Sequence, residues 1–557
     1  MFLFKLLFLL QLHQISSLRF AHTYGSHMVL QKAPQRAIVW GYYNTSSSST
    51  LNKITLSLDN TPVTVSPGQL PNTWIAKLPP TLASNTSHRL QLSDDTNTTI
   101  ILNDILFGDV WLCSGQSNMA FLLQNAFNGS TYVNNSINYP NLRVFTSFKN
   151  NSPHPLPEQP KVQESWKVSS PSAVTEVALR QQDQHANGMR QVQDDDWLVF
   201  SAVCYLYGVE IMKHTKYPVG LVNTNWGGTS VEFWSSKESL SPCNDKQTKS
   251  GGAYNGMITP LLNMTIYGAI WYQGESNVGD KIATFDSQGL PMLTYGCTFP
   301  NMISDWRNKF NEGSLGETSK SFYFGYVQIA PWIAAGYGPS NIRWAQSAGY
   351  GYVPNHKMPN VFNAIAIDLT DRTSPYGSVH IRDKYTVAQR LSAGGISIAY
   401  NDTDIYWQGP YVKDVQVVLN KKDDKDDEDD EDDEDDKDEH KNIIITFDNV
   451  GDGLDVRNTT TNEFEMCILD VINPGANCSL VEEMSKNNSI SLGDWFVVNI
   501  ENSTKNTITL IRSSGKETQP GQRQMIRYAW KSLPFEYKQA GVYANNLPMA
   551  PFVKVIE

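Results

Sequence analysis

The sequence predicts an α/β domain with a mostly parallel sheet, flanked on each side by a β-rich region. The chain has 557 residues, too many for one hydrophobic core, so we expect two or three domains. Between residues 105 and 402, short apolar runs alternate with stretches that favour helix, which indicates buried parallel strands connected by helices. Outside this segment the apolar runs are short, alternating and separated by turn residues, which is typical of antiparallel β structure.

Residues 1–18 are predicted to form a cleaved signal peptide. The stretch "MFLFKLLFLLQLHQISS" combines a lysine, an apolar run too short to span a bilayer, and small residues near its end. We therefore expect a protein of the secretory pathway, extracellular or lysosomal, and no later window is apolar enough for a membrane span. Acceptor sequences for N-glycosylation agree with this routing: Asn44, Asn85, Asn97, Asn128, Asn263, Asn401, Asn458 and Asn502.

The predicted elements follow in chain order. Residues 19–104 form the first β region, with strands at "AIVWGYY" and "KITLSLD". In 105–402 the strands are "ILFGDVWLC", "PVGLVNTNWGG", "YGAIWYQGES" and "NVFNAIAIDL", and helices are predicted over 201–214 and 384–399. Residues 403–557 return to β structure, with strands at "DVQVVLN", "NIIITFD", "SISLGDWFVVNI" and "NTITLIR".

An acidic run at 421–441, "KKDDKDDEDDEDDEDDKDEHK", interrupts the last β region and carries most of the formal net charge of -12. Its self-repulsion predicts a disordered, solvated loop. Calcium buffering is the alternative, although the run lacks the glycine and spacing of an EF-hand. The rest of the chain is almost neutral and has no basic stripe, so we expect no nucleic-acid partner.

The six cysteines are few for this length. Cys113 and Cys204 lie in apolar runs, and we expect them to be buried thiols. The other four could form disulfides, one closing a short loop and one bridging two loops: Cys467 with Cys478, and Cys243 with Cys297.

In "GDVWLCSGQSNMAF" an apolar run ends abruptly in small polar residues that include Ser117. Ligands of open α/β sheets bind beyond the carboxyl ends of the strands. A serine on a tight turn before a helix exposes its hydroxyl for chemistry, and the helix N-terminus stabilises nearby negative charge. Taken alone, the pattern is also that of an ordinary helix cap.

Three further strand ends carry polar residues or glycines. Gly228 in "WGGT" would let a backbone N–H approach a substrate closely, as an oxyanion hole requires. In "WYQGESN", Gln273 or Asn277 could add an amide donor, and Glu275 could orient a histidine. His380 lies in a polar loop directly before the helix predicted at 384–399. A serine is inert near neutral pH without a base, and histidine is the usual one.

Serine, glycine, amide and histidine in this order resemble the four blocks of the SGNH hydrolase superfamily. The segments "FGDVWLCSGQSNM", "WGGTSVEFW", "WYQGESN" and "DRTSPYGSVHIRDKYTVAQRL" are more narrowly similar to the sialate O-acetylesterase family, from about residue 19 to the C-terminus. The resemblance implies a flavodoxin-like three-layer α/β/α domain with β-sandwich-type regions at both ends. It also implies a serine esterase acting on O-acetylated sialic acid.

The resemblance assigns roles to single residues. Ser117 is the nucleophile, His380 the base, and the backbone N–H groups of Ser117 and Gly228 with the Gln273 amide form the oxyanion hole. Many SGNH enzymes place an aspartate three residues before the histidine, where this chain has Gly377. A backbone carbonyl, Glu275 or Asp371 could orient His380 instead, and Asn277 could support the site. The candidates for binding the anionic substrate are Gln116, Arg343 and Arg372, and both arginines could equally be structural.

Two other functions remain open. The same catalytic residues would suit an esterase for other acetylated carbohydrates, such as acetylated xylan. A carbohydrate-binding or adhesive glycoprotein that has lost catalysis would fit the flanking β regions, but it would not need Ser117 and His380. We expect no metal or cofactor, because no motif of metal-ligand spacing is present.

Overall fold

The computed structural model describes residues 18–556 apart from eleven segments. Those segments are 44–50, 176–199, 244–250, 335–337, 420–440, 458–462, 469–477, 479–482, 485–489, 492–494 and 512–523. The predicted signal peptide apart from Leu18, and nearly all of the acidic run, therefore lie outside the described residues. The chain divides into two compact units. The first comprises Met1–Leu240, Gln247–Trp271 and Met302–Phe324, and the second Ser241–Lys246, Tyr272–Asn301 and Gly325–Glu557.

The first unit contains the start of the predicted α/β sheet, whose strands run in the order β11-β10-β12-β9-β13. Strands β10, β12 and β9 are parallel, and β11 pairs with β10 antiparallel. The elements are β1 (Arg19–Phe20), β2 (Val29–Gln31), β3 (Ile38–Tyr42), β4 (Thr55–Leu58), β5 (Thr61–Val63), β6 (Val65–Pro67), β7 (Thr73–Lys77), β8 (Ser84–Ser93), β9 (Thr99–Gly115), α2 (Ser117–Ala120), α3 (Gly129–Asn135), β10 (Leu142–Ser147), β11 (Val162–Val168), α4 (Pro171–Thr175), α5 (Ala202–Thr215), β12 (Val219–Asn225), α6 (Lys237–Leu240), β13 (Gly268–Tyr272) and α7 (Tyr295–Gly313), the last two crossing the limits of the unit.

Strand β9 joins the two kinds of sheet in this unit. Its first part pairs antiparallel with β8, and its later part pairs with β2 and β12. The burial changes along it: of the residues before 105 only Leu102 is buried, whereas all eleven residues from Ile105 to Gly115 are buried. One strand therefore runs through residue 105, where the sequence changes from alternating to fully apolar runs.

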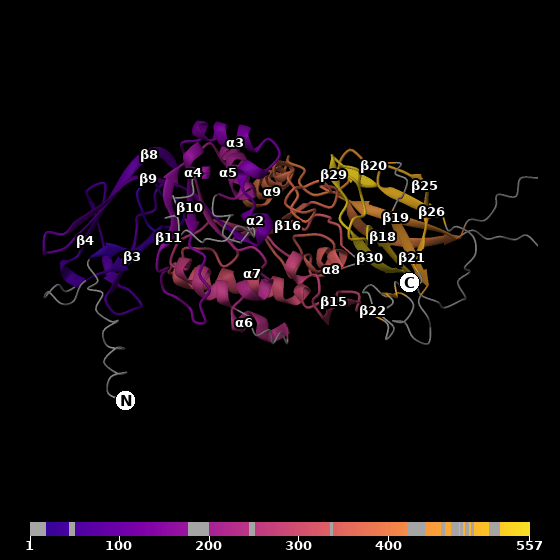
Figure 1. Ribbon diagram of the computed structural model, residues 1–557, viewed down its shortest axis with the longest axis horizontal. Helices are drawn as coiled ribbons and strands as arrows, with labels where there is room; N and C mark the ends of the chain where they lie inside the picture. The colour runs from indigo at the N-terminus through magenta and orange to yellow at the C-terminus, as the bar shows by residue number, and fades with distance from the viewer. Residues whose placement is uncertain are drawn as a thin grey trace, which may run out of the picture. The chain divides into compact units, whose positions relative to one another are not determined.

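Helix α5, predicted over 201–214, packs against β10 and β12. Its first turn is capped by Ser201, whose hydroxyl accepts from the Cys204 N–H at 3.1 Å, and the chain leaves the helix at Lys216 in a left-handed conformation. Figure 1 shows α3, α4 and α5 gathered on one side of β10.

The prediction that Cys113 and Cys204 are free thiols is wrong. Both are fully buried, as expected, but they form a disulfide that joins β9 to the first turn of α5. The apolar sequence around each cysteine indicated its burial, whereas the partner is set by the packing of a helix on a strand 91 residues away. The two other disulfides pair as considered, Cys243 with Cys297 and Cys467 with Cys478.

The second unit contains the other end of the α/β segment and the C-terminal β region. Strand β17 lies beside β16, and α9 packs against β17. The C-terminal strands form antiparallel sheets in the orders β18-β19-β26-β25, β24-β21-β27-β30 and β20-β28-β29 (Figure 1). The elements are β14 (Ile282–Phe285), β15 (Pro291–Leu293), β16 (Tyr323–Gln328), α8 (Gly338–Ala345), β17 (Val361–Ile365), α9 (Lys384–Ala399), β18 (Tyr411–Leu419), β19 (Lys441–Asp448), β20 (Leu454–Val456), β21 (Phe464–Ile468), β22 (Glu483–Met484), β23 (Ile490–Ser491), β24 (Phe496–Val497), β25 (Asn499–Ser503), β26 (Thr507–Ile511), β27 (Gln524–Tyr528), β28 (Val542–Ala544), β29 (Leu547–Pro548) and β30 (Phe552–Ile556).

Among the described residues, no helix is both long and apolar enough to cross a membrane.

Candidate active site

The predicted site residues fall into two groups, one in each unit. Ser117 heads the first group, at the start of α2 directly beyond β9. Between residues 105 and 123 every residue is buried except Ser117. The cap position of α2 is occupied by Gln116, which is itself buried, so Ser117 is the first helical residue and not the cap. Gly115, with φ of 139°, makes the turn before it in a conformation that favours glycine.

The strand register brings the loop of Gly228 to the same edge as Ser117. Asn225, the last residue of β12, lies opposite Gly115, the last residue of β9. The Trp226 N–H donates to the Gly115 carbonyl at 3.0 Å, so the two loops start side by side. Gly228 has φ of 71°, and a side chain placed there would meet no atom within 4 Å. The backbone at Gly228 is therefore open to an approaching ligand.

In the second unit, Gln273 follows β13 and is fully buried. Its amide nitrogen donates to the Asn277 Oδ1 at 2.7 Å, and its Oε1 accepts from the Tyr295 hydroxyl at 3.1 Å. Asn277 in turn donates to Asp280 at 2.9 Å. Gly274, with φ of 139°, makes the bend that brings Asn277 back beside Gln273. These contacts hold the Gln273 amide in one orientation, as a preorganised donor requires.

His380 is oriented by a backbone carbonyl. Its Nδ1 lies 2.6 Å from the Tyr376 carbonyl oxygen, so Nδ1 carries the hydrogen and donates. Nε2 then holds the lone pair that a general base uses. Gly377, with φ of 85°, makes the turn that places this carbonyl beside His380 Nδ1. Asp371 does not orient His380 through Nδ1, because its two oxygens accept from the backbone and guanidinium of Arg382 at 2.8–3.0 Å.

Burial lowers the pKa of the His380 imidazole, and the charge of Lys384 lowers it further, while the bond to the Tyr376 carbonyl acts in the opposite direction. Lys384 is fully buried at the start of α9, with its Nζ 5.0 Å from the centre of the Tyr272 ring. Burial lowers the pKa of Lys384 to about 7, although nearby Glu275 favours the charged form. Glu275 thus interacts with a buried lysine of the same unit.

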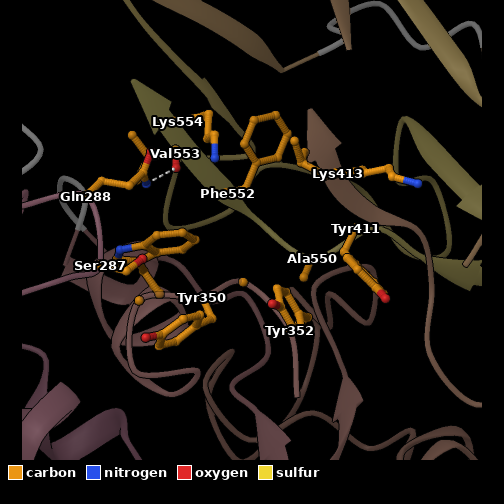
Figure 2. Close-up of a pocket in the computed structure, with 14 residues that line it drawn as sticks. Ser287, Gln288, Tyr350, Tyr352, Tyr411, Lys413, Ala550, Phe552, Val553 and Lys554 are labelled. Carbon is orange, nitrogen blue, oxygen red and sulfur yellow. Dashed lines mark hydrogen bonds between the residues drawn. The ribbon is translucent and has the colours of Figure 1, made fainter. Parts of the chain in front are cut away.

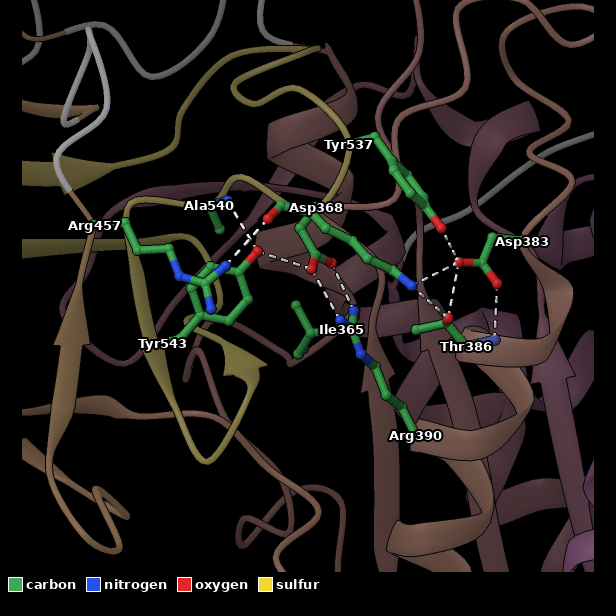
Figure 3. Close-up of polar contacts among 10 residues, drawn as sticks. Ile365, Asp368, Asp383, Thr386, Arg390, Arg457, Tyr537, Ala540 and Tyr543 are labelled. Atoms are coloured by element: carbon green, nitrogen blue, oxygen red, sulfur yellow. Dashed lines mark hydrogen bonds and ion pairs between the residues drawn. The ribbon is translucent and has the colours of Figure 1, made fainter.

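The loop from Asp368 to Asp383, which carries His380, is held by polar contacts with residues 535–543 (Figure 3). Asp383 caps α9 through the Thr386 N–H at 3.0 Å and accepts from the Tyr537 hydroxyl at 2.7 Å. The other contacts are Lys538 Nζ to Asp383 at 3.3 Å, Lys538 N–H to the Asp368 carbonyl at 2.6 Å, Tyr543 hydroxyl to the Asp368 carboxylate at 3.0 Å, and Thr370 hydroxyl to the Phe535 carbonyl at 2.6 Å.

Both arginine candidates have partners within the protein. Arg343 is fully buried in α8, and its guanidinium donates to four backbone carbonyls, those of Ile329, Ala330, Lys531 and Ser532. Arg372 is exposed and pairs with Glu536 at 2.7 Å. These contacts favour the structural role for both.

Sequence reasoning missed Tyr376, Lys384 and Tyr537. A carbonyl partner such as that of Tyr376 has no side-chain signal in a sequence. Lys384 stands inside the quoted motif, and Asp383 followed by Thr386 before a predicted helix is a detectable capping pattern. Tyr537 lies more than 150 residues beyond the loop it holds, and nothing in its neighbourhood marks it.

Comparisons with known proteins identify the family of the chain. Residues 107–316 match the family described as carbohydrate esterase, sialic acid-specific acetylesterase, and residues 435–556 match the sialate O-acetylesterase C-terminal domain. The chain is 31% identical to the sialate O-acetylesterase of Mus musculus and 32% identical to that of Homo sapiens. These alignments cover 97% of the chain and 94% and 92% of the two relatives.

A solved structure shares the fold. A carbohydrate acetylesterase from Xanthomonas citri superposes with a TM-score of 0.68 at 23% identity, covering 96% of this chain and 99% of that one. The fold and these matches define the chain as an enzyme of the carboxylic ester hydrolase class. More narrowly, the chain belongs to the sialate O-acetylesterase family.

Proposed function

We propose that this enzyme removes O-acetyl groups from sialic acids, including 9-O-acetyl groups, through an acetyl-Ser117 intermediate. The observation that carries the proposal is the placement of Ser117, the one residue between 105 and 123 that is not buried, at the carboxyl end of a buried strand. The relatives named as sialate O-acetylesterases supply the substrate class.

In the proposed mechanism, His380 Nε2 takes the proton of the Ser117 hydroxyl as its oxygen attacks the acetyl carbonyl. The backbone N–H groups of Ser117 and Gly228 and the Gln273 amide stabilise the negative oxygen that forms. The sugar hydroxyl leaves with the proton held by His380. Water, deprotonated by the same imidazole, then attacks the acetyl-enzyme and releases acetate. Every proton is carried by His380, which makes its orientation by Tyr376 central to the proposal.

The finer description of the fold belongs to this proposal. We infer a flavodoxin-like three-layer α/β/α domain of the SGNH type, with β-sandwich-type regions before and after it. The parallel strands β10, β12 and β9 and the helices α5 and α9 support the first part. The antiparallel sheets of the C-terminal strands support the second.

The first test is acetate release from 9-O-acetyl-N-acetylneuraminic acid. Ser117→Ala should lower kcat by at least about 10³-fold, because the nucleophile is lost while the oxyanion donors remain. Ser172→Ala, which changes an exposed serine of α4, is the matched control and should retain wild-type turnover. Wild-type activity in Ser117→Ala would refute the mechanism. A serine-directed fluorophosphonate should label the wild type and not Ser117→Ala, and a failure to label the wild type would favour a non-catalytic glycoprotein.

The second candidate function is deacetylation of other acetylated carbohydrates, such as acetylated xylan. The name of the Xanthomonas citri protein, a carbohydrate acetylesterase, favours it, because that fold covers nearly the whole chain. The catalytic residues would be the same, so only the substrate discriminates. Turnover of an acetylated xylan with none of 9-O-acetylated sialic acid would move the proposal to this substrate.

We further propose that the protein is a secreted or lysosomal glycoprotein. Within the described part of the chain, most asparagines of the acceptor sequences are exposed: Asn85, Asn97, Asn128, Asn401 and Asn502. A shift in electrophoretic mobility after endoglycosidase treatment of protein from secretory cells tests this, and an unchanged mobility would contradict it.

A further inference from the structure

The second unit contains a cavity of about 270 Å³ lined by aromatic side chains, which we call the tyrosine pocket. It lies between the loop after α8, the hairpin β14–β15 and the strands β18 and β30. Its defining residues are Tyr350, Tyr352, Tyr411, Trp344, Phe552 and Lys554 (Figure 2). None of the predicted catalytic residues lines it. Its volume is slightly below the 300–1,000 Å³ typical of pockets for drug-sized ligands, which suits a single ring-sized group.

The three tyrosines of the pocket are half-buried and contact one another, so they form one wall, whereas Trp344 and Phe552 are buried. Tyr352 and Tyr411 stack at 4.7 Å between ring centres with an interplanar angle of 22°. Tyr350 meets Tyr352 edge to face at 6.2 Å. Its hydroxyl lies 2.9 Å from His356 Nε2. Aromatic faces of this kind pack well against the C–H face of a pyranose ring, which is apolar although its rim is polar.

The wall is preorganised by its backbone. Gly349 and Gly351 have φ of 78° and 77°, a region that favours glycine. A Cβ at Gly349 would lie 2.4 Å from the Asp286 side chain, so the loop passes this residue closely. Trp344 donates to Asp286 at 3.2 Å, and Gly351 N–H donates to the Ser347 hydroxyl at 2.8 Å. A ligand would therefore find the rings already ordered.

The opposite wall, strand β30, is fixed by Gln288. Its amide nitrogen donates to the Val553 carbonyl at 3.0 Å, and its Oε1 accepts from the Val555 N–H at 3.0 Å (Figure 2). These two bonds hold the strand on either side of Lys554, whose side chain points toward the tyrosines in Figure 2.

Four polar side-chain groups of the pocket have no protein partner within the described part of the chain. They are the Lys554 ammonium and the hydroxyls of Ser287, Tyr352 and Tyr411. The other lysine of the pocket differs, because Lys413 pairs with Asp448 at 3.2 Å and points away from the cavity in Figure 2. One unpaired cation beside an aromatic wall is complementary to a ring that carries a carboxylate.

We propose that the tyrosine pocket binds an acidic pyranose, with its C–H face on Tyr352 and Tyr350 and its carboxylate on Lys554. A peptide rich in proline is the other ligand that tyrosine-lined surfaces recognise, but it needs an extended groove and no cation. The compact cavity and Lys554 favour the sugar. The pocket gives the enzyme a binding site for acidic glycans that does not depend on turnover.

The test is an NMR titration of the full chain with methyl α-N-acetylneuraminide, which carries no acetyl ester. Lys554→Met should weaken binding at least about tenfold, since a hydrogen bond to a charged group is lost. Lys554→Arg should restore most of it. Tyr352→Ala should also weaken binding, whereas Lys413→Met, the matched control, should leave it unchanged. A neutral methyl galactoside should bind at least about tenfold more weakly than the acidic sugar.

Binding must persist in Ser117→Ala and His380→Ala, which separates this pocket from the catalytic residues. Lys554→Met should hydrolyse a soluble aryl acetate at the wild-type rate, so a failure here is distinct from a failure of the proposed esterase. No binding, equal binding in Lys554→Met, equal binding of the neutral sugar, or binding of a proline-rich peptide in its place would each overturn the proposal.

Discussion

A single residue, Gly377, explains how the His380 ring is oriented without a carboxylate. The left-handed turn at Gly377 places the Tyr376 carbonyl against His380 Nδ1. An aspartate at that position would carry a Cβ in a conformation that side chains rarely adopt. The carbonyl fixes the tautomer but holds no full charge, so it stabilises the imidazolium less than a carboxylate would. In the proposed mechanism the electrostatic stabilisation would therefore come mainly from the proposed oxyanion donors.

In the pH profile of kcat/KM, the midpoint of the acid limb should lie below the ordinary histidine pKa of about 6.5. Burial lowers the pKa of His380, so the imidazole stays neutral and able to accept a proton as the pH falls toward that value. Activity is lost only when the pH passes through the lowered pKa. A pH profile of 9-O-acetyl ester hydrolysis measures the limb, and a midpoint above 6.5 would contradict the environment described for His380.

Lys384→Met should shift that limb to higher pH. The pKa of Lys384 is about 7, so the lysine is charged where His380 titrates, and its charge disfavours imidazolium. Removing the charge raises the pKa of His380. Lys309→Met, which changes an exposed lysine of α7, is the control and should leave the midpoint in place. An unchanged midpoint in a folded Lys384→Met protein would exclude this coupling.

At the residue scale, the sequence predicted Ser117, Gly228, Gln273 and His380 from their positions after apolar runs. The structure places Ser117 at the start of a helix and the other three in loops, but their chemical roles stay predictions. Other roles could not be predicted, because they depend on which group occupies the space beside a side chain. Arg343 is an example, since its four carbonyl partners come from two distant segments.

At the scale of elements, α9 shows what local sequence determines. The helix spans Lys384–Ala399, the predicted limits, because Asp383 caps it and its apolar residues recur with helical spacing. The position of the helix, by contrast, depends on contacts with distant residues. The cap also accepts from Tyr537 and Lys538, so the start of the helix that follows His380 is tied to the C-terminal segment.

Tyr537→Phe should loosen the loop that carries His380. The substitution removes one hydrogen bond to a carboxylate and should lower the free energy of unfolding by about 1 kcal/mol, since Tyr537 is partly exposed. We expect kcat to fall about three- to tenfold with little change in KM, because substrate binding does not use this contact.

The control is Tyr406→Phe, which removes the hydroxyl of another exposed tyrosine that has no hydrogen bond within the described part of the chain. This substitution should change neither the free energy of unfolding nor kcat. A Tyr537→Phe enzyme with unaltered kcat would show that the contact stabilises the fold without positioning His380.

At the scale of the whole molecule, the three disulfides differ in the length of chain that they close. Cys113–Cys204 encloses 91 residues and Cys467–Cys478 only 11. The loss of chain entropy on closure predicts about 4–5 kcal/mol of stabilisation for the first and about 3 kcal/mol for the second.

Denaturant unfolding of the two double alanine variants, Cys113→Ala with Cys204→Ala and Cys467→Ala with Cys478→Ala, should reveal this order. An equal or reversed effect would mean that strain or residual structure outweighs loop closure. In the wild type, a thiol reagent should label these four cysteines only after their disulfides have been reduced.

The fold class could be predicted because strands alternating with helices leave a regular pattern in the sequence, as "PVGLVNTNWGG" and the segments of α5 and α9 do. What the sequence could not predict are contacts between distant segments. The Cys113–Cys204 bond and the pairing of β2 with β9 depend on which surfaces meet after collapse, and no local pattern encodes them.

Strand β9 makes the N-terminal β region a poor candidate for exchange by domain shuffling. A gene broken at residue 105 would cut one continuous strand and remove β2, whose Val29–Gln31 pair with Leu106–Gly108. The strand left without its partner would be β9, which ends two residues before Ser117. We therefore expect a fragment starting at 105 to be insoluble, and changes in this region to be inherited together with Ser117 and not exchanged independently of it.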